Sequence, residues 1–379
     1  MVPMIDIRPG SNPQRIAGSD VPVIFGPGSI CRVGAACREL GASRVLLVTD
    51  PGIRSAGHVD RALASLQHAG LIARTYDHAD PNPTTETVDH ALAVAREFHP
   101  DLIVGLGGGS SMDTAKGVNF LYTNGGRMSD YWGTGKAGLP MLPMIAIPTT
   151  AGTGSEAQSY ALISDAATHA KMACGDKKAL PRLAILDPDL VATVPPATAA
   201  ATGIDAIAHA VETSACTKRN DLSRPLSQGA WQLLESSFMT APGMGHSALS
   251  SMLLGAHLAG CAIENSMLGA AHATANPLTA RFGITHGVAV GLMLPHVVRF
   301  NSSDGENPYS DLDDDPNRLA DRLDQLLAAA RLPRRLRDIQ VPEQALPELS
   351  RLSGRQWTAA FNPRPVGEKE LLAIYQTAF

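Results

Sequence analysis

The first half of the chain alternates short apolar runs with longer, Ala-rich stretches, and this alternation restricts the fold more than any other feature of the sequence. The apolar runs have the length and the Val, Ile and Leu content of buried strands, and the stretches between them have helical periodicity. The expected strands are 21–25, 44–50, 72–76, 102–106 and 144–147, and the expected helices are 30–40, 58–69 and 85–98. Strands and helices in this order predict a parallel sheet with helices on its faces.

The strand pattern ends near Pro195 and Pro196, and the rest of the chain has the pattern of helices. The expected helices are 198–213, 227–237, 246–265, a segment through residue 280, 287–298, 316–330 and 368–377. A chain of 379 residues is too long for one ordinary core, and its apolar fraction of 44% is enough to fill two. We therefore expect an α/β domain at residues 1–195 and an all-helical domain at residues 196–379.

Two loops of the expected α/β domain have the composition of a nucleotide-binding site. The strand 102–106 leads into the segment 107–110 (Gly-Gly-Gly-Ser), where glycines leave room for a phosphate and the next helix, expected to begin near Ser111, directs free amides to the same place. The loop 148–156 is rich in threonine, serine and glycine and follows another strand. Either loop alone is also compatible with a tight turn or a capped helix start, but two such loops at strand ends favour a nucleotide.

The helical domain contains a candidate metal site. Asp205 and His209 are four residues apart, so on a helix their side chains lie on one face about one turn apart. That pair alone is better explained as a hydrogen-bonded helix face. His272 and His286 follow downstream, and all four residues have small or apolar neighbours, among which an unpaired charge or ring nitrogen is costly. One carboxylate and three imidazoles suit Fe²⁺ or Zn²⁺ and are poor ligands for calcium or magnesium. We expect this site to lie in the cleft between the two domains.

Composition excludes several other classes of protein. A net charge of −5 with 18% charged residues provides no basic surface for nucleic acid, and apolar stretches such as 287–295 are too short to span a bilayer. The N-terminus lacks the pattern of a signal peptide. The five cysteines are scattered without a Cys-x-x-Cys pair, which favours buried free thiols over disulfides or a thiolate zinc site. We expect a soluble, cytoplasmic protein without a nucleic-acid or membrane partner.

Together, the motifs of the chain resemble those of the iron-containing (group III) alcohol dehydrogenase family. A single motif of this kind is weak, but many of them in register are specific. The matching motifs run from about residue 20 to the C-terminus: Asp50, Pro81-Asn82-Pro83, 107–113, 148–156, Leu186-Asp187-Pro188, 203–209, His272, His286-Gly287 and Asn362-Pro363-Arg364-Pro365. The resemblance implies a dehydroquinate-synthase-like fold, in which a nucleotide-binding parallel-sheet domain precedes an all-helical metal-binding domain. It also implies a homodimer joined through the N-terminal region.

The resemblance further implies which residues bind the metal and the cofactor. Fe²⁺ or Zn²⁺ would be held by Asp205, His209, His272 and His286. The contacts to a nicotinamide dinucleotide map onto Asp50, Asn82, Gly108, Gly109, Ser110, Thr149, Thr150, Thr153 and Lys171, and Gly107 and Asp113 belong to the same motif.

The preference between NAD and NADP depends on Asp50. A carboxylate at the end of this strand can accept hydrogen bonds from the ribose hydroxyls of NAD, whereas it would repel the 2′-phosphate of NADP, so we expect NAD. The alternative is that Asp50 only caps the turn at 51–52.

The chain departs from the family pattern at Asn276. Many members have a histidine at this position, four residues after the third ligand, where it is available to pass a proton near the nicotinamide. An amide cannot titrate, so Asn276 is expected to contact the substrate or the cofactor while the proton travels by another route.

These features predict a metal-dependent, NAD(P)-linked alcohol dehydrogenase or aldehyde reductase that acts on a small molecule. The cation would lower the pKa of the substrate oxygen, and the nicotinamide would accept or supply a hydride. The main alternative is a specialised aldehyde or oxo-acid reductase of the same family, such as a maleylacetate-reductase-like enzyme. A dehydroquinate-synthase-type cyclase ranks lower because no cluster of Lys and Arg accompanies His272 or His286. The remaining alternative is a non-enzymatic nucleotide- or metal-binding module.

Overall fold

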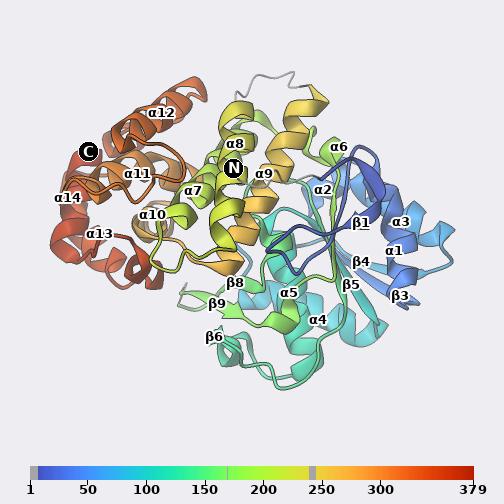
Figure 1. Cartoon of the computed structure of the whole chain (residues 1–379). Helices are drawn as coiled ribbons and strands as arrows, with labels where there is room; N and C mark the ends of the chain where they lie inside the picture. Colours follow the sequence, from blue (N-terminus) through green and yellow to red (C-terminus); the bar gives the residue numbers. More distant parts are fainter. Residues whose placement is uncertain (1–6, 169, 239–244) are drawn as a thin grey trace. The chain divides into compact units, whose positions relative to one another are not determined.

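The computed structural model describes residues 7–168, 170–238 and 245–379 (Figure 1). The contacts within the chain divide it into two compact units. The α/β unit contains the described residues up to Thr150 together with Gly154–Val194. The helical unit contains Ala151–Thr153 and the described residues of Pro195–Phe379.

A seven-stranded sheet forms the centre of the α/β unit, in the order β1-β2-β10-β7-β5-β3-β4. Its strands are β1 (Gly10–Gln14), β2 (Val23–Phe25), β3 (Arg44–Val48), β4 (Ile72–Tyr76), β5 (Leu102–Gly107), β7 (Met144–Pro148) and β10 (Leu183–Leu186). All neighbouring strands are parallel except β1 and β2, which are antiparallel. The predicted parallel sheet is therefore confirmed. The antiparallel edge strand β1 was not predicted, because its sequence (Gly-Ser-Asn-Pro-Gln) is polar and mostly exposed and has no apolar alternation.

Helices cover both faces of this sheet (Figure 1). They are α1 (Val33–Glu39), α2 (Pro51–Ser55), α3 (His58–His68), α4 (Thr85–Phe98), α5 (Gly109–Asn124) and α6 (Pro188–Val191). Alternate residues of β3 point to opposite faces, so Leu46 and Val48 pack in one apolar cluster with α4 and α5. Val45 and Leu47 pack in a second cluster with α1 and α3.

Other features of this unit also differ from the sequence-based prediction, which had no strand at β10. The strand expected at 44–50 ends at Val48, because Asp50 is already the N-cap of α2. A small second sheet, in the order β6-β9-β8, was not predicted. Its strands are β6 (Gly133–Thr134), β8 (Tyr160–Ser164) and β9 (Lys171–Gly175), and short 3₁₀ helices lie at Ser29–Arg32, Met128–Tyr131, Ser155–Ala157 and Lys177–Ala179.

The regular secondary structure in the described residues of the second unit is all helical, as predicted. Its helices are α7 (Pro196–Ala215), α8 (Ser223–Ser237), α9 (His246–Asn265), α10 (Ala270–Phe282), α11 (His286–Asn301), α12 (Pro316–Ala329), α13 (Leu346–Ser353) and α14 (Glu368–Ala378), with 3₁₀ turns at Leu336–Ile339, Glu343–Ala345 and Trp357–Phe361. The sequence-based prediction missed α13. Helix α7 packs against α8, α9 and α11, and α10 packs against α11. Among the described helices, only α9 has the length and apolarity needed to cross a membrane, and 67% of that stretch is buried inside the protein, as in a core helix.

All five cysteines are free thiols. The expectation that they are buried holds for four of them and is wrong for Cys31, which is exposed in the 3₁₀ turn before α1.

Candidate active site

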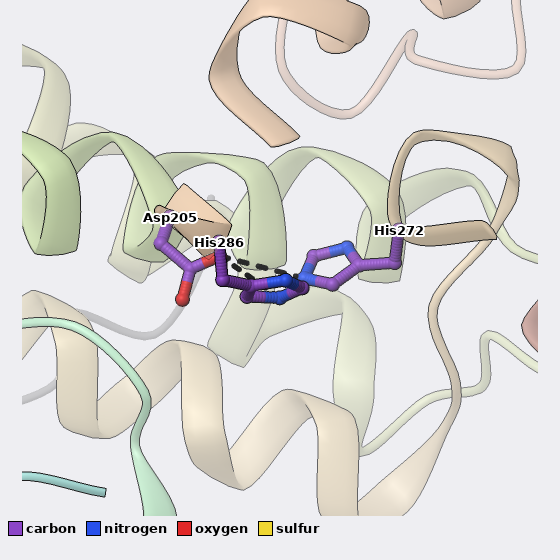
Figure 2. Close-up of side chains that lie close together, drawn as sticks. All are labelled: Asp205, His272 and His286. Atoms are coloured by element: carbon purple, nitrogen blue, oxygen red, sulfur yellow. Dashed lines mark ion pairs between the residues drawn. The ribbon is translucent and has the colours of Figure 1, made fainter. Parts of the chain in front are cut away.

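Three of the four predicted metal ligands converge in the helical unit. Asp205 comes from the middle of α7, His272 from the first turn of α10 and His286 from the first residue of α11 (Figure 2). Their candidate ligand atoms all lie within 4.8 Å of one another. Asp205 Oδ1 is 3.5 Å from His272 Nε2 and 3.9 Å from His286 Nε2.

His209 lies beside this group. Its Nε2 is 3.7 Å from the other carboxylate oxygen of Asp205, which confirms that the two side chains share one face of α7. Its ring stacks on that of His272, with 4.8 Å between the ring centroids and 18° between the planes. The four predicted ligands therefore lie together. Asp205, His272 and His286 form the most compact group, and His209 lies next to it.

The polar atoms of this cluster fit a bound cation. Asp205, His209 and His272 are each no more than 5% exposed, whereas the His286 side chain is 28% exposed. Asp205 Oδ1, His209 Nδ1 and His272 Nε2 are buried without a hydrogen-bond partner among the described residues. A buried polar atom without a partner is costly, and a divalent cation between Asp205 Oδ1 and His272 Nε2 would satisfy both atoms.

The electrostatics of the cluster favour the ionised carboxylate. Burial opposes ionisation of Asp205, but His209, His272 and His286 together hold the pKa of its carboxyl well below the usual range. Burial lowers the pKa of His209 and nearby His272 lowers it further, whereas Asp205 and Glu212 raise it; the net lowering favours the neutral ring, which is the form that binds a metal.

A fifth residue, Glu212, completes the surroundings of His272 and was not recognised from the sequence. Its Oε2 is in close contact with His272 Nδ1, on the opposite side of the ring from Asp205. Glu212 is 4% exposed. One feature of the sequence could have identified Glu212 as a site residue: it follows His209 by three positions on α7 and therefore lies on the same helix face.

The close approach of α11 to α7 depends on Gly287. A Cβ atom at this position would overlap the carbonyl oxygen of Ala201 and lie 3.2 Å from the Cβ of Asp205. Glycine therefore lets the first turn of α11 contact α7, which places His286 beside Asp205. This explains the glycine of the His286-Gly287 motif.

The predicted cofactor residues of the α/β unit follow neighbouring parallel strands. Asp50 follows β3, the glycine segment 107–110 follows β5, Thr149 and Thr150 follow β7, and Asn82 lies beyond β4. The carboxyl ends of parallel strands lie at one edge of the sheet, where α/β folds bind ligands.

Hydrogen bonds connect several of these segments. Ser111 Oγ donates to Asp50 Oδ2 at 2.9 Å, the amide of Asn82 donates to Ser110 Oγ at 3.2 Å, and the amide of Thr149 donates to the carbonyl of Gly107 at 3.0 Å. The structure therefore brings Asp50, Asn82, Thr149 and the glycine segment together.

Asp50 is a helix cap in this structure. Its Oδ1 accepts from the amide of Ile53 at 3.1 Å, as the alternative interpretation of this residue anticipated, while Oδ2 accepts from Ser111. A carboxylate has further lone pairs, so these contacts leave acceptor capacity for a ligand.

The start of α5 is shaped by glycine. Gly107 has a φ of 151°, and a Cβ atom there would lie 3.1 Å from Asp50 Oδ2 and collide with Ser111. Helix α5 begins at Gly109, two residues earlier than predicted, and its N-cap, Gly108, provides no side-chain cap. A Cβ atom on Gly108 would be 3.5 Å from the side chain of Thr150. The threonine-rich loop thus lies next to the amino end of a 16-residue helix.

Three more of the candidate residues in this unit differ in their exposure. Asp113 is buried behind the glycine segment and accepts from Ser155 Oγ at 3.1 Å, and burial raises its pKa to about 6 against the charges of Lys116 and Lys171. Lys171 is exposed at the start of β9. Thr149 is buried with no hydrogen-bond partner for its hydroxyl among the described residues.

Two further candidates belong to the helical unit. Thr153 lies in the short segment Ala151–Thr153, which groups with that unit. Asn276 is partly buried one turn after His272 on α10, and its amide donates to Gln356 Oε1 at 3.0 Å.

Both halves of the chain match one family. Residues 21–188 match the family described as iron-containing alcohol dehydrogenase, and residues 199–379 match the family described as the C-terminal part of Fe-containing alcohol dehydrogenases.

Full-length relatives support this match. The chain is 35% identical to alcohol dehydrogenase 4 of Schizosaccharomyces pombe, over 94% of this chain and 87% of that protein. It is 34% identical to 1,3-propanediol dehydrogenase of Citrobacter freundii (94% and 96%) and 30% identical to lactaldehyde reductase of Escherichia coli (94% and 97%).

Solved structures agree with the sequence comparisons. A crystal structure of 1,3-propanediol oxidoreductase superposes with a TM-score of 0.89 at 34% identity, covering 95% of this chain and 98% of that one. A sulfoacetaldehyde reductase from Bifidobacterium kashiwanohense, in complex with NAD⁺, superposes with a TM-score of 0.86 at 26% identity, covering 95% and 97%. The chain therefore belongs to the iron-containing alcohol dehydrogenase family and is an oxidoreductase that interconverts alcohols and aldehydes.

Proposed function

We propose that this enzyme holds Fe²⁺, with Zn²⁺ as the alternative, on Asp205, His209, His272 and His286, and uses NAD to interconvert a small alcohol and its aldehyde. The observation that carries the metal assignment is the set of buried, unpartnered atoms that face one another from α7 and α10. The family's description as iron-containing supports iron as the first candidate.

The metal ligands and Asn276 have different roles in the proposed reaction. A divalent cation bound here would supply a Lewis acid for the substrate oxygen. Asp205 and the histidines would hold the cation, and the low exposure of Asp205, His209 and His272 would limit the access of water to it. Asn276 donates to Gln356 and cannot titrate, so it does not carry a proton, and we assign it a contact to the substrate or the cofactor.

The cofactor assignment rests on the α/β unit. Asp50, Asn82, Gly107, Gly108, Gly109, Ser110, Thr149 and Thr150 follow neighbouring strands, and we assign them to the nucleotide, with Asp113, Thr153 and Lys171 as further members of the site. The NAD⁺ complex of the sulfoacetaldehyde reductase and the NAD-dependent methanol dehydrogenase of Bacillus methanolicus, which is 34% identical over 73% of this chain, support NAD for this chain. The homodimer, the cytoplasmic location and the position of the site between the domains stay predictions from the sequence.

The test is reconstitution of the stripped enzyme. Purified protein is treated with a chelator, its metal content is measured, and Fe²⁺ or Zn²⁺ is added back before NADH consumption is followed with a panel of aldehydes, including hydroxy- and carboxy-substituted ones. We expect turnover only in the reloaded protein. A matched variant, His286→Ala, removes the most exposed ligand and should disturb the core least.

Two outcomes would overturn parts of this proposal. Full turnover in verified metal-free protein would assign the chain to metal-independent reduction, as in the maleylacetate-reductase-like alternative. Wild-type metal content and activity in His286→Ala would remove that residue from the ligand set.

A further inference from the structure

We propose that Glu212 and Asn362 are positioning residues that fix the first turn of α10 and thereby direct His272 Nε2 at the metal, an inference that rests on the proposed metal site. Asn362 belongs to the Asn-Pro-Arg-Pro motif near the C-terminus, to which the proposed reaction assigns no task.

The contact between Glu212 and His272 sets the orientation of the imidazole. Glu212 Oε2 is paired with His272 Nδ1, while His272 Nε2 faces Asp205 Oδ1 at 3.5 Å. A carboxylate accepts but does not donate, so it favours the tautomer with the proton on Nδ1 and leaves the lone pair of Nε2 for a cation. Glu212 therefore determines which ring nitrogen is available.

The second oxygen of Glu212 caps the helix that carries this histidine. The first amides of a helix have no partner within the helix, and the N-cap of α10 is Gly269, which has no side chain to accept from them. Glu212 Oε1 accepts from the amide of Ala271 at 2.7 Å and, more weakly, from the amide of His272 at 3.4 Å. One carboxylate thus holds both the backbone and the ring of His272.

Asn362 caps the remaining amide of this turn. Its Oδ1 accepts from the amide of Ala270 at 3.2 Å, and its Nδ2 donates to Asn301 Oδ1 at 2.6 Å and to the carbonyl of Arg364 at 2.7 Å. Asn301 Nδ2 in turn donates to the hydroxyl of Tyr309 at 2.7 Å. Asn362, Asn301 and Tyr309 are all buried, so this arrangement is fixed from several sides.

Gly269 allows the two capping side chains to approach together. A Cβ atom at Gly269 would lie 3.0 Å from Asn362 Oδ1 and 3.2 Å from Glu212 Oε1, closer than side chains normally pack. The glycine before α10, the glutamate of α7 and the C-terminal motif therefore form one capping site for the helix that presents His272.

The test measures metal affinity, with Co²⁺ as a visible-absorption probe of the stripped protein. Glu212→Gln keeps an oxygen for the backbone amides but presents an NH₂ group to His272 Nδ1, which favours the opposite tautomer. We expect Co²⁺ affinity to fall about 10–100-fold, as is typical for loss of an outer-shell partner, with an altered ligand-field spectrum. Asn362→Ala removes the acceptor of the Ala270 amide and the bonds to Asn301 and Arg364 but leaves the contact between Glu212 and the ring of His272, so it should reduce Co²⁺ affinity less. The matched control is Glu235→Gln on α8, where a carboxylate bonded to Arg322 is neutralised and affinity should not change.

The outcomes separate this inference from the metal proposal. Wild-type protein that binds no Co²⁺ would contradict the metal site itself. Wild-type protein that binds Co²⁺, together with a folded Glu212→Gln variant of equal affinity and spectrum, would contradict only the positioning role.

A measurement on the wild type covers the case in which Glu212→Gln does not fold. NMR spectra are recorded on Zn²⁺-loaded protein with ¹⁵N-labelled histidine. The signals of the His272 ring nitrogens are identified as those that are absent from the spectrum of the His272→Asn variant. We expect a protonated Nδ1 and an unprotonated Nε2, and the reverse assignment would overturn the inference.

Discussion

At the residue scale, the metal centre depends on the balance of charges in a buried cluster. Asp205 and Glu212 are two carboxylates with little access to water, and His272 lies between them. Such carboxylates are stable in the interior only when protons or a cation neutralise them. The cluster therefore takes up a proton where it lacks a metal, and the two should compete.

This competition predicts different pH dependence for stripped and loaded protein. Burial opposes protonation of His272, but Glu212 and Asp205 raise its pKa to about 9 in the folded protein, compared with about 6.5 in the unfolded chain. A histidine with a raised pKa stabilises the fold fully below the unfolded value and loses that contribution as the pH rises through the folded value. We expect the free energy of unfolding of the stripped protein to fall between about pH 6.5 and 9, by up to ~3 kcal/mol.

With saturating Zn²⁺ the stabilisation by metal should instead grow as the pH rises over this range, because protons leave the ligands. Urea unfolding across a pH series measures both curves. Parallel curves for the stripped and loaded proteins would contradict the proton–metal exchange at His272.

Asp50 leads to a second prediction at this scale. Asp50→Asn keeps an oxygen that can accept from the amide of Ile53 and places an NH₂ group that can donate to Ser111 Oγ, so the cap of α2 should survive, but the negative charge is removed. Repulsion between two charges a few ångströms apart is worth ~1 kcal/mol in water and more in a partly desolvated site. We expect kcat/KM with NADPH relative to NADH to rise by about 5-fold or more.

Steady-state kinetics with both cofactors on both proteins provides the measurement, and thermal unfolding checks that the cap is intact. A wild type that prefers NADPH, or an unchanged ratio in the variant, would remove Asp50 from the discrimination.

At the element scale, the site depends on how closely helices can approach one another. Helix α11 contacts α7 at Gly287, and this contact places His286 beside Asp205. Glycine costs helix stability relative to alanine, so its presence in the first turn of α11 is explained by the packing.

We predict that Gly287→Ala separates the two helices. The added methyl group would overlap the Ala201 carbonyl, and such overpacking typically costs about 1–3 kcal/mol and occasionally more. Metal content should fall together with stability, because His286 moves with α11. Metal analysis and urea unfolding are the measurements.

Gly354→Ala is the control for this variant. Its added methyl group would meet atoms no closer than 3.6 Å, in ordinary contact. Equal stability and metal content in the two variants would show that the contact at Gly287 does not hold the ligands together.

At the scale of the whole molecule, the metal ligands and most of the proposed nucleotide residues belong to different compact units. Each unit has its own buried core, so loss of metal should leave the sheet and its loops folded. We predict that removing the metal abolishes turnover but leaves the Kd for NADH unchanged. NADH fluorescence titration of stripped and reloaded protein measures this, and loss of NADH binding on chelation would show that the two sites are coupled.

The sequence determined much of the architecture because local patterns were strong. Strand 72–76 and helices 85–98 and 246–265 have the bounds expected from their apolar periodicity, and α4 begins where the Thr84 side chain caps it. Where the pattern was weak the prediction failed: β1 is polar, and α13 is a short helix among loops and 3₁₀ turns.

For the site, the sequence determined the residue types and the tertiary structure decided their geometry. The four-residue spacing of Asp205 and His209 predicts a shared helix face, and the motifs indicate His272, His286 and the glycine segment. The sequence does not show that Glu212 contacts His272 or that Asn362 caps α10, because these pairs are distant in the chain and meet only when α7, α10 and the C-terminal segment pack. Periodicity reports which face of an element is buried, whereas the partner of a buried polar atom is decided by the packing of elements from distant parts of the chain.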